Sequence, residues 1–413
     1  MGRPKKEELA KKVEEKVKAK PAKEAKAEKV EAKPAKAPKE DKVKELKKAT
    51  PKEAKDAGKK EKKKVVAGSV IMKGVPAAEY RKLSDPRAHA LFSTMTGTPG
   101  WVKGKIYEFA AESDVGKSGL ATYVLGLFQA SGEQVGMVDA EGAADRIFQK
   151  KIGLNSDDIF YTQPFCGEDA FADVRTLFND KGVKVAVLDS IGHCTPRAMA
   201  TDASNAMGAL ARLTSVEMPK VSKAVQSNKG NLIVISQIKK QPGVMGDSRY
   251  VTGGSGVMFA SRVRWWLNAV ETLRDEKTKQ ITGYTIRMVV KKNHTGPKRS
   301  TPFDIKLNQL FQIKWDETAL AWAKQFKLVD KEKKVIKLKD GKVIELTKTF
   351  DADLTEACQG REAEIFWAVN DIFERMEDGQ SVDYEASEDD LEGESKGGDE
   401  GEEEADDDDL GSL

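Results

Sequence analysis

The sequence predicts an α/β fold in which a mostly parallel sheet is flanked by helices, and three observations indicate it. An apolar run, Ile106–Ala110, leads into a short polar loop and then into an apolar helical pattern. Further apolar runs in 135–141, 183–190 and 231–237 are short, rich in β-branched residues and separated by longer helical patterns. This alternation is typical of parallel strands covered by helices. Two later runs, 263–270 and 283–292, flank a turn-rich segment and predict a hairpin that extends the sheet.

Charge is unevenly divided between the two ends of the 413-residue chain. Residues 1–64 hold 25 Lys and Arg against 13 Asp and Glu, whereas residues 383–413 hold 16 acidic residues and one Lys. Neither segment has enough large apolar residues to bury a core, so both are expected to be disordered tails. The basic tail indicates either contact with nucleic acid or a solubilising role, and the acidic tail indicates a solvated segment.

The chain between the tails is expected to form one main domain and a small lobe. The pattern changes near Asp316, where a helix on each side of a hairpin at Lys339–Lys342 predicts a small α+β lobe. The predicted organisation is a basic tail at 1–64, a helical or linker segment at 65–95, an α/β core at 96–315, the lobe at 316–382 and an acidic tail at 383–413.

Cysteine and histidine usage indicates no metal site and no disulfide framework. The cysteines have no C-x-x-C spacing and the histidines are far apart: Cys166, Cys194, Cys358, His89, His193 and His294. No apolar run approaches the length of a membrane span. The N-terminal segment has no apolar region of a secretory signal and too many glutamates for a transit peptide. We therefore expect a cytoplasmic protein with no membrane partner.

The loop after Ile106–Ala110 has the pattern of a phosphate-binding loop. Residues Ala111–Ser118 read AESDVGKS and match G-x-x-x-x-G-K-[ST] except that Ala111 replaces the first glycine. In such a loop Lys117 contacts the β- and γ-phosphates and the Ser118 hydroxyl binds Mg²⁺. A chance Gly-Lys-Ser triplet is the alternative, but the strand before it and the helix after it favour a nucleotide site. The remaining phosphate contacts are expected from the backbone of Ala111, Glu112, Ser113, Asp114, Val115, Gly116 and Gly119.

Polar residues close the three later strands of the predicted parallel sheet. Glu141, Asp189 and Gln237 come at these ends, and ligands of open α/β sheets bind at the carboxyl ends of the strands. Asp189 is expected to hold Mg²⁺, with a helix N-cap as the alternative. Glu141 is the candidate to orient the attacking water, unless it is only a surface carboxylate. Gln237 is the candidate sensor of the γ-phosphate, unless it is a buried amide with backbone partners.

A long glycine-rich loop follows Gln237. Residues 238–256 contain five glycines together with Lys239, Lys240 and Arg249, and loops of this length inside a domain are usually functional or disordered. Glycine amides and basic side chains suit contacts with the phosphates of nucleic acid. Alone, the loop is a weak indication of DNA binding.

Taken in order, these segments resemble the RecA family of homologous recombinases. The resemblance covers about Thr96–Lys306 and includes TGTPGWVKGKIYEF, AESDVGKS, VDAEGAADRIF, YTQPFCGEDAF, VAVLDSIGHCTPRA, ISQIKKQPGVM, VTGGSGVMFASRVR and VVKKNHTGP. It implies a protein that uses ATP and Mg²⁺ to polymerise as a helical filament on single-stranded DNA. Such a filament pairs with a homologous duplex, exchanges strands and hydrolyses ATP.

The resemblance also implies roles for individual residues. Lys117, Ser118, Glu141, Asp189 and Gln237 match the phosphate, Mg²⁺, catalytic, Walker B and γ-phosphate-sensing positions. Further nucleotide contacts are implied for Asp145, for Phe148 stacked on adenine, and for Lys292 reaching the ATP of a neighbouring protomer. DNA contacts are implied for Arg197, Arg212, Lys239, Lys240, Arg249, Thr252, Gly253 and Gly254. An acidic C-terminal tail is shared by many members and would contact single-strand-binding or loader proteins.

Some features depart from the family pattern. Ala111 replaces a glycine, His294 stands where a second lysine is expected, and the second DNA-binding loop is one residue shorter with no aromatic between Met245 and Gly246. The long basic tail is also unusual and would suit a bacteriophage-encoded member. Two alternatives stay open: a hexameric helicase or translocase on the same fold, and a non-catalytic DNA-binding protein that retains it. Electron microscopy separates a protein that forms filaments from one that forms rings. An assay of DNA-stimulated ATP hydrolysis separates both enzymes from the non-catalytic protein.

Overall fold

The computed structural model describes residues 77–380, except 202–207, 241–248, 276, 298, 300 and 348–350. All of them belong to one unit of the chain, Gly74–Leu413. The two charged tails and the middle of the glycine-rich loop lie outside the described residues, and the domain boundaries stay predictions.

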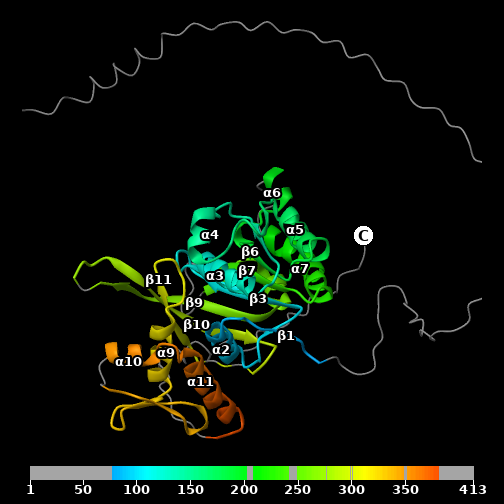
Figure 1. Cartoon of the computed structure of the whole chain (residues 1–413). Coiled ribbons are helices and arrows are strands. Elements are labelled where there is room, and N and C mark those ends of the chain that lie inside the picture. Colours follow the sequence, from blue (N-terminus) through cyan, green and yellow to red (C-terminus); the bar gives the residue numbers. More distant parts are fainter. Residues whose placement is uncertain are drawn as a thin grey trace, which may run out of the picture. The chain divides into compact units, whose positions relative to one another are not determined.

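A mixed sheet forms the centre of this unit and confirms the predicted fold class (Figure 1). Its order is β11-β10-β9-β3-β7-β6-β4-β5, and β8 pairs with β7. Neighbours from β9 to β5 run parallel, whereas β9, β10 and β11 are joined by antiparallel pairing. The strands are β3 (Lys105–Ala111), β4 (Val135–Asp139), β5 (Phe160–Thr162), β6 (Val185–Asp189), β7 (Asn231–Lys240), β8 (Arg249–Val251), β9 (Ser261–Arg274), β10 (Ile281–Asn293) and β11 (Phe303–Asn308).

Helices cover both faces of the parallel part because alternate residues of each strand point to opposite faces. Ile233 and Ile235 of β7 pack in one core with α3 (Lys117–Ala130) and α2 (Pro86–Thr96). The intervening Leu232 and Val234 pack in a second core with α5 (Gly167–Asn179) and α7 (Ala209–Ser227). Strands buried on both faces explain why the sequence shows continuous apolar runs rather than alternation.

Shorter elements connect the strands and helices of the sheet. A two-stranded ribbon of β1 (Tyr80–Arg81) and β2 (Trp101–Val102) flanks α2. The others are α4 (Arg146–Ile152), the 3-10 turn η1 (Ile191–His193), α6 (Arg197–Thr201) and α8 (Gly254–Ala260).

The C-terminal lobe contains the predicted hairpin and two elements that the sequence did not predict. The hairpin pairs β13 (Val335–Lys337) with β14 (Val343–Glu345) around η3 (Lys339–Gly341), and β12 (Val329–Asp330) adds a third strand. The helices are α9 (Trp315–Gln325), α11 (Glu362–Glu377) and the unpredicted α10 (Asp351–Cys358). Both α10 and β12 are too short to give a clear periodic pattern.

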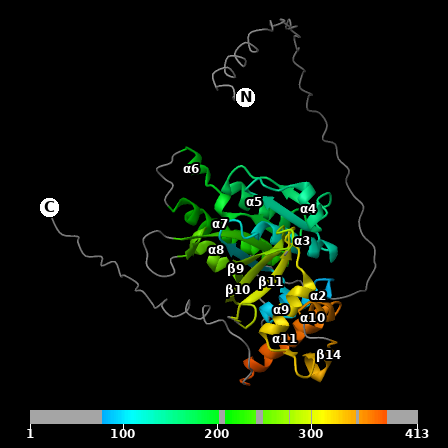
Figure 2. The same ribbon diagram turned by 90° about the vertical axis from the view of Figure 1, so that its left-hand side faces the viewer.

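The lobe shares a continuous core with the sheet. Trp322 of α9 and Phe366 of α11 belong to the same buried cluster as Phe92 of α2 and Trp265 of β9. Figure 2, like Figure 1, shows α9 and α11 beside α2, and α11 contacts α2 directly. In the part of the chain that the structure describes, no helix combines the length and apolarity needed to cross a membrane.

Candidate functional site

The turn between β3 and α3 presents backbone N–H groups at the start of a helix. Gly116 lies at φ 88°, and no side chain caps the first turn of α3. A Cβ at this position would lie 2.3 Å from the Phe311 ring, so both the backbone angle and the space require glycine. Uncapped N–H groups at a helix N-terminus are an anion-binding arrangement.

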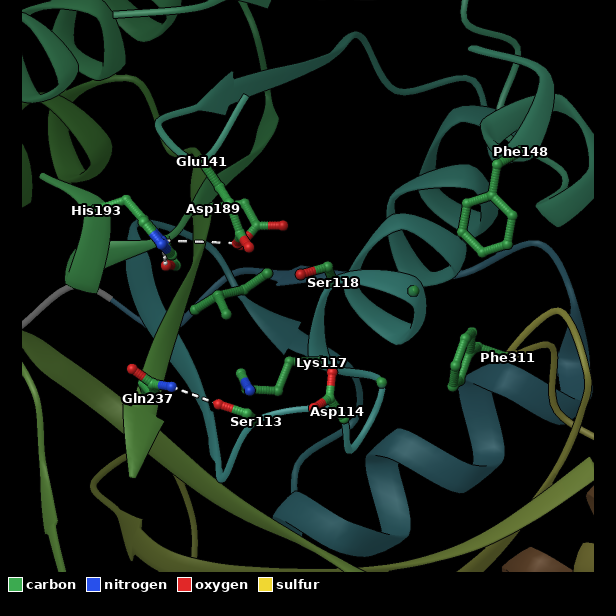
Figure 3. A pocket seen from close by; sticks show the side chains of 14 residues that line it. Ser113, Asp114, Lys117, Ser118, Glu141, Phe148, Asp189, His193, Gln237 and Phe311 are labelled. Atoms are coloured by element: carbon green, nitrogen blue, oxygen red, sulfur yellow. Dashed lines mark hydrogen bonds and ion pairs between the residues drawn. The ribbon is translucent and has the colours of Figure 1, made fainter. Parts of the chain in front are cut away.

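This turn borders a cavity of about 420 Å³ (Figure 3). The structure brings together, around this cavity, residues that the sequence separates by up to 198 positions, from Ser113 to Phe311. The lining residues are Ser113, Asp114, Gly116, Lys117, Ser118, Gly119, Glu141, Phe148, Asp189, Ser190, His193, Ile235, Gln237 and Phe311.

Asp189 is a buried carboxylate with spare acceptor capacity. It lies at the end of β6, and its Oδ1 atom is buried without a hydrogen-bond partner. Burial raises the pKa of Asp189 to about 6, although a hydrogen bond from the Ser118 hydroxyl opposes that shift. A buried carboxylate beside a hydroxyl is a suitable oxygen pair for Mg²⁺.

Lys117 contacts its own loop in this structure. Its Nζ atom donates a hydrogen bond to the backbone carbonyl of Glu112 at 2.6 Å. Burial lowers the pKa of Lys117, and the charges of Asp189 and Glu141 oppose that shift. Because the ammonium borders the cavity, it is placed to contact an anion there.

The loop that carries Glu141 is held by Asp139. The Asp139 carboxylate accepts hydrogen bonds from Gly142 N at 2.8 Å, Ala144 N at 2.9 Å and the Tyr161 hydroxyl at 2.9 Å. These contacts fix the backbone on both sides of Glu141, whose carboxylate lies 3.7 Å from Nδ1 of His193.

Gln237 joins the phosphate loop to the glycine-rich loop. Its Nε2 atom donates to Ser113 Oγ at 2.6 Å, and its backbone exchanges hydrogen bonds with Thr252 at 3.2 and 2.9 Å. Further along β7, Lys240 Nζ lies 3.3 Å from a Glu112 carboxylate oxygen. The end of β7 thus contacts both loops.

Two aromatic rings lie at the other end of the cavity (Figure 3). Phe148 projects from α4, and Phe311 projects from the turn after β11 at φ 58°. The Phe311 ring stacks on Tyr284, with centroids 5.4 Å apart and an interplanar angle of 6°. Two apolar rings on one cavity suit a planar, aromatic part of a ligand.

Several residues predicted to contact the nucleotide do not line the cavity. Ala111 is buried at the end of β3, and Glu112 and Val115 belong to the loop without bordering the space. Asp145 caps α4 by accepting a hydrogen bond from Phe148 N at 2.5 Å. Lys292 donates to the Met258 carbonyl at 2.7 Å, outside the cavity.

The residues predicted to contact DNA lie in three places. Lys239, Lys240 and Arg249 lie on the β7–β8 ribbon, where Lys240 is the register partner of Arg249. Thr252, Gly253 and Gly254 continue from β8 into α8, and a Cβ on Gly254 would lie 2.7 Å from Ala211, which precedes Arg212 in α7. Arg197 is held at α5, because it lies 2.8 Å from Asp169 and its backbone N donates to Glu168.

Sequence reasoning missed Phe311, Ser190, His193 and Ile235. Phe311 comes from a turn far from the other lining residues, and its left-handed backbone leaves no sequence pattern. His193 lies far from the other histidines in the sequence, and this spacing gives it no role at the site. The position of Ser190 directly after Asp189 was the one signal that would have found a residue of this group.

Comparisons with known proteins match the same part of the chain. Residues 52–312 match the model of the RecA N-terminal domain. Protein RecA of Wolbachia sp. subsp. Drosophila simulans is 35% identical over 217 residues, which cover 52% of this chain and 61% of the relative. Protein RecA of Ehrlichia ruminantium is 32% identical over 250 residues, which cover 60% of this chain and 70% of the relative.

The chain therefore spans about three fifths of the Wolbachia relative and somewhat more of the Ehrlichia one. Since the family model covers more than half of the sequence, the chain belongs to the RecA family.

Proposed function

We propose that the protein is a DNA-dependent ATPase that assembles on single-stranded DNA and promotes homologous pairing and strand exchange. The observation that carries the proposal is the single cavity shared by Lys117, Ser118, Glu141, Asp189 and Gln237. Its β7 wall runs directly into the basic β7–β8 ribbon. Family membership and the similarity to RecA proteins support it.

ATP would bind along the length of the cavity. The phosphates would contact the N–H groups at the start of α3, and the base would lie between Phe148 and Phe311. Lys117 must leave the Glu112 carbonyl to reach the phosphates, since its Nζ atom donates there now. The hydrogen bond from the Lys117 ammonium to a neutral carbonyl would be replaced by one to a phosphate, in which both partners are charged.

Ser118 and Asp189 would hold Mg²⁺. The unpartnered Oδ1 atom of Asp189 and the neighbouring hydroxyl fit that ion, which when bound would neutralise charge on the phosphates. Glu141 would orient the attacking water, because its carboxylate faces the same cavity from the neighbouring strand. The Gln237 amide would break its hydrogen bond with Ser113 and bond the γ-phosphate instead, which would move β7 and the loop beyond it.

DNA would bind to the β7–β8 ribbon and the start of α7. Lys239, Lys240, Arg249 and Arg212 supply positive charge, and contacts with phosphates are largely electrostatic. Lys240 is paired with Glu112 here, so DNA would compete with the phosphate loop for this side chain. Assembly as a filament, with Lys292 reaching a neighbouring protomer, is the expected oligomeric state.

The first test is ATP hydrolysis by the full chain with and without single-stranded DNA, together with electron microscopy. We expect DNA-stimulated hydrolysis and helical filaments. Lys117→Ala should lower turnover at least a hundredfold, because it removes the positive charge from the separating phosphates. Lys103→Ala is the matched control, since Lys103 pairs with Glu79 away from the cavity.

The outcomes separate the alternatives. Rings in place of filaments would favour the helicase or translocase, and DNA binding without hydrolysis would favour a non-catalytic protein. Near-normal turnover in Lys117→Ala would contradict the assignment of the phosphate loop.

A further inference from the structure

A histidine lies beside the carboxylate proposed to orient the attacking water. His193 ends the η1 turn that follows β6, and its ring borders the nucleotide cavity (Figure 3). Its Nδ1 atom lies 2.9 Å from Ser190 Oγ and 3.7 Å from Glu141 Oε2. The first distance is a hydrogen bond, and the second is within ion-pairing range but longer than a hydrogen bond.

We propose that His193 is a positioning residue for ATP hydrolysis: it orients the Glu141 carboxylate, and it does so under the control of DNA bound at the predicted DNA contacts next to η1, which are Thr252, Gly253 and Arg197. The inference rests on the proposed function, because it assigns Glu141 the water-orienting role.

Glu141 needs such a partner because its side chain is not otherwise fixed. Asp139 holds the backbone of the loop but makes no contact with the Glu141 carboxylate. The side chain is 41% exposed, and among the described residues the His193 ring is the basic group within 4 Å of it. An exposed glutamate otherwise samples several rotamers, and holding it in one raises the fraction of molecules ready to react.

Ser190 fixes the ring that would do this. Ser190 is 5% exposed and follows Asp189, so its hydroxyl sits on a rigid strand end. The Ser190–His193 hydrogen bond spans the η1 turn and sets the direction of the imidazole. A movement of η1 by less than 1 Å would bring Nδ1 to hydrogen-bonding distance of Glu141, or would separate the two groups. Because Nδ1 carries at most one hydrogen, a bond to Glu141 would use the Nδ1–H and would share it with Ser190 or take it from Ser190.

The η1 turn contacts the end of the glycine-rich loop. A Cβ on Gly253 would lie 2.5 Å from the Ile191 side chain, and one on Gly192 would lie 3.7 Å from Thr252 Oγ1. Four residues further along the chain from His193 is Arg197, a predicted DNA contact at the start of α6. DNA bound at Thr252 and Gly253, or at Arg197, would therefore displace η1, and His193 would carry that displacement to Glu141.

The test compares His193→Ala and His193→Gln in the full chain with single-stranded DNA. His193→Ala should lower kcat roughly tenfold or more with KM for ATP within about twofold, because it removes orientation and not binding. His193→Gln should recover part of that loss, since its amide can donate to the carboxylate. His89→Gln, on a ring that packs against Trp367, is the matched control and should behave as wild type.

A double-mutant cycle identifies Glu141 as the target. Single-turnover hydrolysis should be equally slow in Glu141→Gln and in the His193→Ala/Glu141→Gln double variant, because His193 has no carboxylate left to orient. Multiplicative losses would overturn the inference, as would a KM increase without a kcat loss.

Failure of the proposed function is distinguishable. A full chain without DNA-stimulated hydrolysis would overturn the proposed function and this inference together. An active wild type with unaffected turnover in His193→Ala would overturn this inference alone.

Discussion

Asp189 is the residue whose chemistry depends most on its surroundings. The residue is 9% exposed and borders the cavity, and the pKa of its carboxyl group is raised to about 6, chiefly because burial penalises the charged form. In the unfolded chain the same group ionises near pH 4. Without a divalent cation, the folded state therefore carries an energetic cost at neutral pH that a metal ion would offset.

Asp189→Asn should stabilise the cation-free protein while abolishing Mg²⁺-dependent nucleotide binding. The raised pKa means that the folded wild type loses stability as pH rises from about 4 to about 6, by at most about 3 kcal/mol, and the cost is constant above that. Urea unfolding without Mg²⁺ at pH 4 and pH 7.5 measures it. Asp189→Asn should have a higher free energy of unfolding than wild type only at pH 7.5. An equal difference in the free energy of unfolding at both pH values would contradict the assignment.

Gln237 is the residue whose contacts connect the two proposed ligands. Its amide bonds Ser113 in the phosphate loop while its backbone bonds Thr252 at the end of the glycine-rich loop. Allosteric coupling requires a contact that differs between the two liganded states. An amide that can exchange Ser113 for the γ-phosphate supplies such a difference.

Gln237→Ala should still bind ATP but should no longer bind single-stranded DNA more tightly with ATP than with ADP. Fluorescence anisotropy with a labelled oligonucleotide measures the ratio of the two affinities. Gln226→Ala, exposed on α7, is the control and should keep the wild-type ratio. If Gln237→Ala also keeps that ratio, the sensor lies elsewhere.

Among the elements, α9 shows how the lobe is attached to the sheet. Trp322 of α9 is fully buried and donates its indole N–H to the Asp304 carbonyl. Its ring centroid lies 4.8 Å from that of Phe303 in β11 and 4.9 Å from that of Phe366 in α11. The same core continues to Trp265 in the sheet. The lobe is therefore expected to unfold together with the sheet.

Trp322→Ala should lower the free energy of unfolding by about 3–5 kcal/mol, because it leaves a large cavity and an unpaired carbonyl. Calorimetry should show one transition at a lower Tm. Trp367→Ala is the comparison. Because Trp367 is only partly buried, this substitution should lower the free energy of unfolding by less. Two separate transitions in wild type would show that the lobe folds independently.

At the scale of the whole molecule, the tails are expected to act on DNA binding in opposite directions. Residues 1–64 carry 25 basic against 13 acidic groups, and residues 383–413 carry 16 acidic groups and one Lys. A polyanion can occupy basic surfaces in place of DNA, whereas a polycation adds phosphate contacts.

Deleting residues 383–413 should strengthen duplex binding and extend it to higher salt, and deleting residues 1–64 should weaken it. Titrating duplex DNA across a range of salt concentrations with the full chain and both truncations measures the effect. If the tails only solubilise the protein, all three curves will share the same slope and midpoint.

The sequence by itself determined four strands of the parallel part of the sheet, which are β3, β4, β6 and β7, together with the turn between β3 and α3 and the meeting of Glu141, Asp189 and Gln237 at one edge. It did not predict the three-residue strand β5. Short β-branched runs and a local glycine pattern encode the elements, and parallel pairing brings their carboxyl ends together. The predicted roles of these residues stay predictions.

Only the tertiary structure decided that Phe311 borders the cavity, that His193 faces Glu141 and that Lys240 pairs with Glu112. Each of these contacts joins loops or turns distant in the sequence. Hydrophobic periodicity specifies which face of an element is buried, but it says nothing about the direction of a loop side chain. That direction is set by packing between elements, as is the burial that raises the pKa of Asp189.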